Sequence, residues 1–282
     1  ARTVTTGHQL CLATGPAFTV YKALTAVRLA DSLEMRWGTP VIPVFWLASE
    51  DHDFEEISSL WDGKDWHRWA SDGAGGAVGR MDASGALGTL SAWAEGAGIQ
   101  DDVLSGMLSA TNGPLSSAMR RWIHSVIGSD RIVVIDGDDA RLKAAFAPQM
   151  AREIQEGTLC NEVSQVNAVL QSQGHSPQVH VRETNLFHIG QQKRSRLVKT
   201  GETWSAGERT WEATGALLDH LEREPQSFSP NALLRPCTRL ACFRMWLLLE
   251  DLQRWPTGCN CPQLSRLWDC RHQHWCPATA LG

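Results

Sequence analysis

The chain has 282 residues and a net charge of −5, with 43% hydrophobic and 20% charged residues. This composition is ordinary for a globular protein, and the length suits one large domain or two small ones. The acidic balance and the lack of a Lys/Arg-rich block argue against nucleic-acid binding. No apolar run reaches membrane-spanning length and the first twenty residues lack a signal peptide, so we expect a cytoplasmic protein with no membrane partner.

The first half of the chain has the pattern of a parallel α/β sheet. Apolar runs predict a strand over residues 3–9 and a buried strand over 41–48, with a helix from Pro16 to about residue 35 between them. Such a βαβ unit is expected to have a right-handed crossover. Residues 131–136 predict another buried strand. We therefore expect an α/β fold, a Rossmann-like parallel sheet with helices on both faces and helical insertions.

The remaining elements are mostly helical. Helical periodicity recurs over 86–96, 101–110, 114–127, 139–173 and 211–224. Pro148 predicts a break or a new start within the fourth of these segments. Residues 178–181 and 186–189 are short strand candidates, and the Gly/Ala-rich residues 71–79 predict a loop.

Polar clusters follow the first two predicted strands. The first is Gly7-His8-Gln9, and the second is the acidic run over 49–56. In α/β sheets, ligands bind in the crevice beyond the carboxyl ends of the strands. We therefore predict that both clusters line one site.

The first cluster stands before a predicted helix start. Backbone N–H groups at a helix N-terminus favour an anion, and glycine allows the backbone to approach it closely. His8 would bind a phosphate or stabilise charge that develops in a transition state; the alternative is a histidine that satisfies backbone groups in a turn. Lys22 would reach back to the same anion, or it is simply solvated. We assign binding roles to Lys22 and to Gly7, Gln9, Thr14 and Gly15.

The second cluster carries more acids than one loop holds without compensation. Clustered carboxylates repel each other unless a cation, a substrate amine or hydrogen-bond donors offset them. We assign catalytic roles to Glu50, Asp51 and His52, with a carboxylate or His52 as general base toward an attacking amine. We assign binding roles to the flanking Ser49 and Asp53. An acidic cap on the next helix accounts equally well for the last two acids of the run. A divalent metal held through substrate phosphates is left open, and no residue is assigned as its ligand.

Three further groups have competing explanations. Asp138 or Asp139, after the third predicted strand, would either cap the next helix or serve the site. Arg182 would hold a carboxylate in a bidentate manner or form a buried ion pair with Glu183, and Asn185 beside them is assigned to binding. We expect Cys11 to pack as a small hydrophobic residue, and we assign only surface or packing roles to Asp31, His67 and Arg80.

A series of motifs carries a family resemblance. TTGHQ at 5–9, TGP at 14–16, YK at 21–22 and PVFW followed by ASEDHDFEE over 43–56 resemble the bacillithiol-biosynthesis cysteine-adding enzymes. Later segments agree in the same order, so that the similarity spans residues 4 to 236; these segments are 76–81, 134–143, 146–148, 178–187 and 228–236. His180 and Thr184 depart from the family pattern of Asn and Ile.

The resemblance implies an activity. The family adds cysteine to glucosaminyl-malate in the last step of bacillithiol synthesis, by an amide bond between the cysteine carboxyl and the sugar amine. Carboxylates do not condense with amines unaided, so we expect ATP as the activating agent, without a choice between adenylate and acyl phosphate. The resemblance also favours a site role for His8 and implies a homodimer formed through a coiled coil. The rival functions are a nucleotidyltransferase for another small substrate and an inactive truncated remnant.

The tail after Pro236 differs from the rest of the chain. It holds six of the eight cysteines, namely Cys237, Cys242, Cys259, Cys261, Cys270 and Cys276. Their spacing does not fit a structural zinc site. Codons that permit this tail, read one nucleotide earlier, also permit a Gly-Gly-Pro-containing segment similar to the family sequence at that point. We therefore interpret 1–236 as the family core, truncated at its N-terminus, and 237–282 as an out-of-frame tail that forms no domain and no ordered part of the core.

Overall fold

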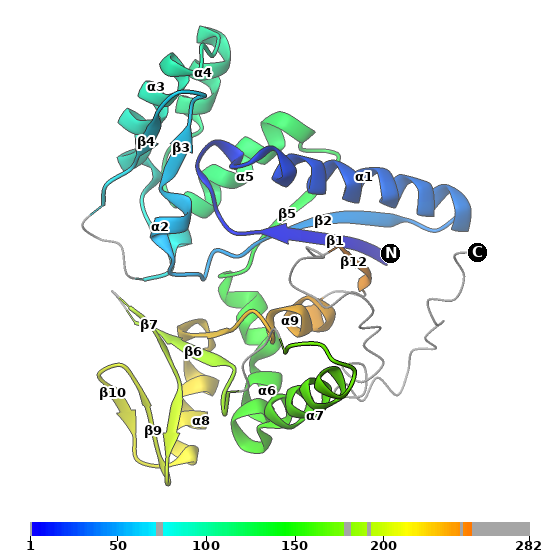
Figure 1. The fold of residues 1–282 in the computed structure, drawn as a ribbon, viewed down its shortest axis with the longest axis vertical. Helices are drawn as coiled ribbons and strands as arrows, with labels where there is room; N and C mark the ends of the chain where they lie inside the picture. The colour runs from blue at the N-terminus through cyan, green and yellow to red at the C-terminus, as the bar shows by residue number, and fades with distance from the viewer. Residues whose placement is uncertain (1, 72–75, 178–181, 191–192, 243–244, 250–282) are drawn as a thin grey trace.

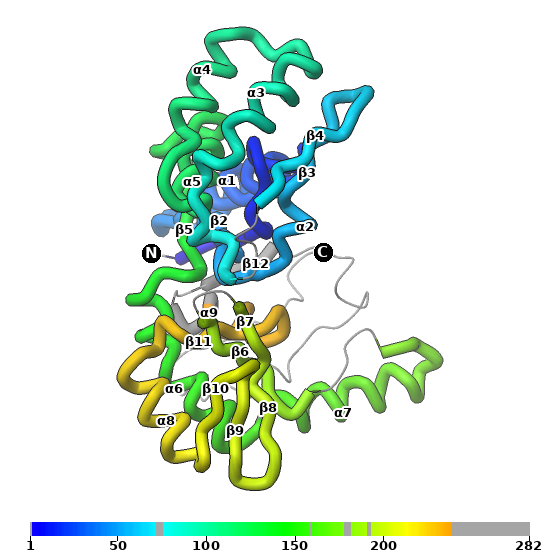
Figure 2. The backbone as a smooth tube through the Cα atoms, turned by 90° about the vertical axis from the view of Figure 1, so that its left-hand side faces the viewer, coloured from blue at the N-terminus to red at the C-terminus, as the bar shows by residue number. Residues whose placement is uncertain are grey.

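The computed structural model describes residues 2–71, 76–177, 182–190, 193–242 and 245–249. The chain forms a lobe built on a parallel sheet and a second lobe of helices and small antiparallel sheets (Figure 1). The sheet lobe contains residues 2–136 and a last strand, and the second lobe contains residues 140–242. The backbone trace from the side shows the same two-part arrangement (Figure 2).

The parallel sheet has the strand order β12-β1-β2-β5. Its strands are β1 (Arg2–His8), β2 (Val41–Leu47), β5 (Val133–Asp136) and β12 (Met245–Leu249), and every pairing among them is parallel. His8 lies opposite Leu47, and Leu47 lies opposite Asp136. The carboxyl ends of β1, β2 and β5 are therefore level. The predicted Rossmann-like α/β fold is confirmed.

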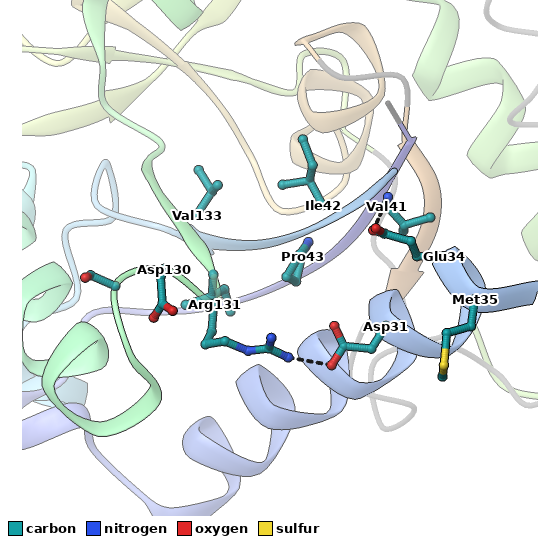
Figure 3. Close-up of a pocket in the computed structure, with 11 residues that line it drawn as sticks. Asp31, Glu34, Met35, Val41, Ile42, Pro43, Asp130, Arg131 and Val133 are labelled. Atoms are coloured by element: carbon teal, nitrogen blue, oxygen red, sulfur yellow. Dashed lines mark hydrogen bonds and ion pairs between the residues drawn. The ribbon is translucent and has the colours of Figure 1, made fainter. Parts of the chain in front are cut away.

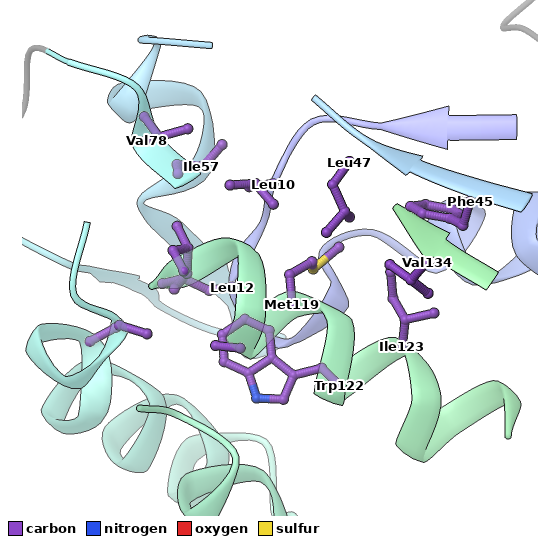
Figure 4. Packing of buried hydrophobic residues seen from close by; sticks show 14 of the residues in the cluster. Leu10, Leu12, Phe45, Leu47, Ile57, Val78, Met119, Trp122, Ile123 and Val134 are labelled. Atoms are coloured by element: carbon purple, nitrogen blue, oxygen red, sulfur yellow. The ribbon is translucent and has the colours of Figure 1, made fainter. Parts of the chain in front are cut away.

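Two helices cover one face of this sheet. α1 (Ala17–Trp37) follows Pro16 and ends at Gly38, whose left-handed φ of 60° suits glycine. α5 (Leu115–Ile127) packs beside it. Apolar side chains from both helices and from β2 and β5 form the core of the lobe (Figure 4); they include Val27, Phe45, Leu47, Met119, Trp122 and Val134.

The opposite face is less covered over β2 and β5. Side chains alternate between the two faces of a strand, so Ile42 and Val133 point away from α1 and α5. They keep 38% and 46% of their surface exposed. Over this part of the sheet the structure places helices on one face, whereas the sequence predicted both.

Between β2 and β5 the chain forms the predicted insertion. Two of its helices match the predicted ranges closely, and a short β-hairpin that the sequence did not indicate precedes them. The elements are α2 (Phe54–Ile57), β3 (Ser59–Trp61), β4 (Trp66–Arg68), η2 (Val78–Arg80), η3 (Ala83–Ala86), α3 (Leu87–Gly96) and α4 (Asp101–Ser109).

The second lobe has its own hydrophobic core, formed by side chains such as Phe146, Trp204, Leu217 and Phe228. Two three-stranded antiparallel sheets, β11-β6-β7 and β10-β9-β8, pack there with its helices. Its elements are α6 (Ala140–Glu156), α7 (Thr158–Ser172), β6 (Leu186–Ile189), β7 (Arg194–Arg196), β8 (Val198–Thr200), β9 (Thr203–Ala206), β10 (Arg209–Trp211), α8 (Thr214–Arg223), η4 (Pro225–Ser227), β11 (Phe228–Pro230) and α9 (Arg235–Cys242). Strands of three or four residues are too short to show a periodicity, so the sequence predicted β6 alone among those described.

The predicted helix break at Pro148 is wrong. α6 runs through Pro148 and ends at Gly157, whose left-handed φ of 57° and N–H bond to the Glu153 carbonyl close the helix. Pro148 lacks one backbone donor, but Phe146 and Met150 on either side of it are fully buried. Packing outweighs the lost hydrogen bond, and glycine supplies the stop.

The predicted end of the ordered fold at Pro236 is also wrong. α9 continues to Cys242, Cys237 is buried in the second-lobe core, and β12 pairs with β1. The sequence of β12, Met-Trp-Leu-Leu-Leu, is wholly apolar and suits a parallel strand. Residues 250–282 and the strand candidate at 178–181 lie outside the described residues, so the interpretation of the tail as out of frame stays a prediction. Over the described part of the chain, no helix is both long and apolar enough to cross a membrane.

Candidate active site

The structure brings the two predicted polar clusters together. His8 is the last residue of β1, and residues 49–52 follow β2 directly. The Gln9 side-chain amide donates to Oδ2 of Asp51 at 3.4 Å, which joins the two clusters across the strand ends. The two predicted clusters therefore lie together at the carboxyl ends of β1 and β2, where the crevice of a parallel sheet is expected.

Asp51 stands at the centre of this crevice between two arginines of the second lobe. Nη1 of Arg194 lies 3.6 Å from Oδ1, and Nη2 of Arg235 lies 3.6 Å from Oδ2. The backbone N–H of His52 donates to Oδ1 at 2.8 Å. Burial by itself would raise the pKa of Asp51, but the charges of Arg235 and Arg194 and the hydrogen bonds from His52 and Gln9 outweigh it and hold the pKa below its usual value. Asp51 is therefore an anion at neutral pH.

Glu50 is almost wholly buried, with 1% of its surface exposed, and it is paired with Arg235. Oε1 of Glu50 lies 2.6 Å from Nε of Arg235, although neither atom has hydrogen-bond alignment. A buried carboxylate needs such a counter-charge. The other oxygen faces Gly137, where an added Cβ would lie 2.8 Å from it and 2.7 Å from the carbonyl oxygen of Leu47. Glycine is therefore required at 137.

His52 is half exposed at the mouth of the crevice. Its Nδ1 lies 3.3 Å from Oδ1 of Asp51 and 3.5 Å from Nη1 of Arg194. Arg194 can only donate, so a hydrogen bond from it needs an unprotonated Nδ1, whereas a hydrogen bond to Asp51 needs the proton on Nδ1. The charge of Asp51 favours the second tautomer, in which Nε2 is a proton acceptor and the pair has the arrangement of an oriented general base.

His8 and Lys22 both lie near the ring of Phe18, in the first turn of α1. Phe18 packs edge-on against the His8 ring with the centroids 4.9 Å apart, and Nζ of Lys22 lies 5.5 Å from the centroid of the Phe18 ring. Nδ1 of His8 lies 3.0 Å from the Gln9 carbonyl oxygen, so in this geometry Nδ1 is the donor. An imidazole, an ammonium group and a helix N-terminus are therefore close together, as anion binding requires.

The loop before α1 has a strained backbone. Ala13, Thr14 and Gly15 have φ values of 49°, 71° and 73°. Glycine accepts such values freely, but a β-branched residue such as Thr14 does so only under constraint. Strain of this kind often occurs at ligand-binding loops, which agrees with the binding roles predicted for Thr14 and Gly15.

Among the predicted binding residues, Asp53, Ser49 and Asn185 make structural contacts, and Arg182 is exposed. Asp53 is exposed and caps α2 by accepting from the backbone N–H of Glu56. Ser49 is fully buried, donates to Asp136 and accepts from the N–H of Asp138. The Ser49 hydroxyl and the Asp53 carboxylate both accept hydrogen bonds from backbone N–H groups. They do so because the chain turns sharply after β2 and its backbone donors need acceptors.

The other two belong to the second lobe. Asn185 is buried there, and its amide donates to Glu153 at 2.9 Å and accepts from Asn231 at 2.7 Å. Arg182 and Glu183 are both exposed, so a buried ion pair does not describe them, and the binding role of Arg182 stays a prediction.

The acids after β5 divide between the two predicted roles. Asp139 caps α6 by accepting from the N–H groups of Arg141 and Leu142. Asp138 forms ion pairs with Lys143 and with Arg80, whose Nε lies 2.5 Å from Oδ2. Arg80 is exposed, as predicted, and its ion pair with Asp138 also joins it to the network beside the site.

Sequence reasoning missed the cations of the site. Arg194, Arg235 and Lys143 are all more than nine-tenths buried, and each is paired with an acid that follows β2 or β5. Arg235 and Lys143 lie inside motifs that carry the family resemblance, and this position was the sequence signal that could have identified them. Arg194 lies in a three-residue strand outside those motifs, so no sequence signal pointed to it.

Cys11 behaves as predicted. Burial, and then the charge of Glu56, raise the pKa of its thiol to about 12. The thiol packs beside Gly15, where an added Cβ would lie 2.5 Å from Cβ of Cys11. A thiolate nucleophile at this position is therefore strongly disfavoured.

A hollow of about 460 Å³ lies at the opposite end of the sheet (Figure 3). The amino ends of β2 and β5 line it with Ile42 and Val133, and an ion pair of Asp31 with Arg131 spans its side. Ligands of parallel sheets bind at the carboxyl ends, so this hollow is not the candidate site. Within the described ranges, no group of three or more His, Cys, Asp or Glu side chains is arranged to hold a metal ion.

Comparison with known proteins agrees with the sequence motifs. Residues 1–243 match the family described as the N-terminal Rossmann-like domain of the bacillithiol-biosynthesis protein BshC. The chain is 35% identical over 250 residues to a protein of Cytophaga hutchinsonii, 32% over 242 residues to one of Flavobacterium johnsoniae and 33% over 264 residues to one of Heliobacterium modesticaldum. Each is named "Putative cysteine ligase BshC".

These matches cover 83% of the chain but only 44%, 45% and 46% of the three relatives. The chain thus spans less than half the length of these proteins. The family match extends past Pro236 to residue 243, in agreement with the continuation of the fold into α9. By the extent of this match, the chain belongs to the BshC family.

Proposed function

We propose that this chain provides the Rossmann-domain site of a cysteine ligase, which joins the carboxyl of cysteine to the amine of glucosaminyl-malate as the last step of bacillithiol biosynthesis. The names of the relatives support a ligase. The observation that carries the proposal is the pairing of anionic Asp51 with His52 in a crevice lined by charges of both signs. Cysteine and glucosaminyl-malate together bring carboxylates and an amine, which need partners of both signs.

The crevice suits amide formation. Asp51 holds the substrate ammonium group, and Nε2 of His52 accepts a proton so that the nitrogen becomes a nucleophile. The nitrogen then attacks the activated carbonyl carbon of cysteine, a C–N bond forms, and the bond from that carbon to the activating group breaks. His52 releases the first proton to solvent, and its Nε2 then accepts the remaining extra proton from the nitrogen.

The region around His8 suits the activating group. We propose that ATP supplies it and that the N-terminus of α1, His8 and Lys22 bind its phosphates. The same features favour a second candidate, a nucleotidyltransferase that acts on another small substrate. The two differ in the acceptor, because only the ligase needs the Asp51–His52 pair to deprotonate an amine.

The test is a product assay together with a binding assay. The chain is incubated with cysteine, glucosaminyl-malate, ATP and Mg²⁺. Mass spectrometry then measures the condensed thiol product and the AMP or ADP that is released. Release of AMP indicates an adenylate, and release of ADP an acyl phosphate. Calorimetry with each substrate alone shows whether this part of the protein binds it. Absence of both binding and product would overturn the proposal and favour an inactive remnant, while nucleotide transfer without condensation would favour the second candidate.

A further inference from the structure

Arg194 belongs to the second lobe, yet its guanidinium lies against residues of the sheet lobe. It is the first residue of β7, and only 4% of its side chain is exposed. Nη1 lies 3.5 Å from Nδ1 of His52 and 3.6 Å from Oδ1 of Asp51. Arg194 is therefore near both members of the pair on which the proposed reaction depends.

The second lobe holds this guanidinium in place. Nε donates to Oγ of Ser229 at 3.0 Å, and Nη2 donates to the carbonyl oxygen of Pro230 at 2.9 Å. The Phe187 ring lies under the guanidinium, 3.9 Å from its central carbon. These contacts fix the plane of the side chain and turn Nη1 toward Asp51 and His52. Lysine cannot make the same set of contacts, because it lacks the planar, forked guanidinium group of arginine.

The contacts of Nη1 are longer than good hydrogen bonds, so its effect on the pair is mainly that of a nearby charge. Arginine keeps its proton in proteins, and a fixed positive charge favours the ionised form of a neighbouring carboxyl group. Arg235 contributes a second positive charge at the other oxygen of Asp51. Arg194 and Arg235 of the second lobe thus supply the positive charge that the acidic loop lacks.

We propose that Arg194 is a positioning residue, which from the second lobe stabilises the Asp51 carboxylate in its orientation toward His52. This inference rests on the proposed function for its effect on turnover, but its effect on Asp51 can be measured without any substrate.

Arg196 provides a matched control. It lies two residues further along β7, and its central carbon is 5.4 Å from the same Phe187 ring. The neighbouring charge that acts on it is that of Arg182, outside the crevice. Arg196→Met therefore removes a positive charge and a ring contact from the same strand without removing a neighbour of Asp51.

The experiment compares Arg194→Met, Arg194→Lys and Arg196→Met by carboxyl ¹³C NMR, with Asp51→Asn used to assign the Asp51 signal. We expect Arg194→Met to raise the pKa of Asp51 by about one unit and Arg196→Met to leave it unchanged. Arg194→Lys keeps the charge but loses both anchors, so it should raise the pKa less. In a preparation that forms product, we expect kcat to fall about tenfold in Arg194→Met, with a smaller loss in Arg194→Lys and none in Arg196→Met.

The outcomes separate this inference from the proposed function. An unchanged Asp51 titration in Arg194→Met, or equal shifts in Arg194→Met and Arg196→Met, overturns the positioning role. A shift confined to Arg194 variants in a protein that never forms product supports the positioning role and counts against the ligase. If Arg194→Met does not fold, the comparison of Arg194→Lys with Arg196→Met decides: different Asp51 titrations support the role, and equal ones overturn it.

Discussion

Asp51 and His52 show how one carboxylate differs from its neighbours in an acidic run. Asp51 has two buried arginines beside it, whereas Asp53 and Glu55 take part in a helix cap and in an ion pair with Arg68. The charge of Asp51 is fixed by its surroundings, so it serves to hold a cation rather than to accept a proton. In the proposed reaction the base is therefore His52, whose side chain is about half exposed.

Substitutions in the acidic run test this division. Asp51→Asn should lower turnover about tenfold to a hundredfold, because a charge-assisted hydrogen bond to the substrate ammonium is lost. His52→Ala should lower it about a hundredfold through loss of the general base. Glu56→Gln, at an exposed position on α2, should change it little. Turnover rates and melting temperatures of the three variants check this. Losses of turnover that parallel losses of melting temperature, or an equal loss of turnover in Glu56→Gln, would show that the loop has a structural rather than a catalytic role.

His8 is the second residue-scale test. His8→Ala should lower turnover by about 10²–10³, because His8, with Nδ1 bonded to the Gln9 carbonyl, would donate to developing charge through Nε2 in its protonated form. The nucleotide release assay is the measurement, with Arg28→Ala on the exposed surface of α1 as control. Turnover close to that of the unsubstituted protein would leave His8 as a turn residue that bonds the Gln9 carbonyl.

At the scale of elements, the geometry of the site depends more on the turns after β1, β2 and β5 than on the strands themselves. Each turn crosses the same edge of the sheet, and they pack against one another through backbone. Gly137 is the tightest point, because an added Cβ would meet the Leu47 carbonyl oxygen at 2.7 Å and Nε1 of Trp46 at 2.7 Å. Backbone atoms of a buried strand cannot move aside cheaply.

Gly137→Ala should therefore lower the free energy of unfolding by about 1–3 kcal/mol and also displace Glu50. Gly88 in α3 has no neighbour within 4 Å of an added Cβ, so Gly88→Ala should raise stability by about 0.5–1 kcal/mol. Urea unfolding of both variants is the measurement. A Gly137→Ala protein as stable as the parent would show that the turn can shift.

At the scale of the whole molecule, activity depends on the second lobe staying folded. Its β11-β6-β7 sheet carries Arg194 and its anchors, and His188 lies on the central strand β6. His188 packs with Trp211, His220 and Phe228, with ring centroids 5.5 Å from each. Burial, and then the charge of Arg209, lower the pKa of His188 to about 4, and the same two causes lower the pKa of His220.

From the lowered pKa values of His188 and His220 we predict that the second lobe loses stability in acid. Below about pH 6.5 the unfolded histidines bind protons while the folded ones stay neutral, so stability falls as pH drops from 6.5 toward 4, by up to about 1.4 kcal/mol per pH unit for each histidine. The charges that face the pair are Arg209, Arg223 and Glu224, and only Glu224 opposes the trend. Unfolding free energies at several pH values measure it. His188→Phe should flatten the curve in this window, and an unchanged slope would contradict the assignment.

Much of the fold and part of the site followed from the sequence. The parallel sheet and the helical insertion were predictable because apolar periodicity is a local property of the chain. His8, Asp51 and His52 were predictable as neighbours because residues that follow adjacent parallel strands emerge at one edge. The helix stop at Gly157 and the caps by Asp53 and Asp139 are local as well, and the sequence offered the cap at Asp139 as one of two alternatives.

The tertiary structure alone decided which charges complete the site. Arg194 lies 142 residues from His52 in the chain, and no periodicity or spacing connects the two. Ion pairing at that separation depends on how the two lobes pack, which follows from burial summed over both cores. For the same reason Asn185, which lies inside a family motif, bonds Glu153 and Asn231 within the second lobe. By itself the sequence determined which strand ends form the site and which acids follow them; only the packing of the second lobe decided which of those acids stays ionised and which cations keep it so.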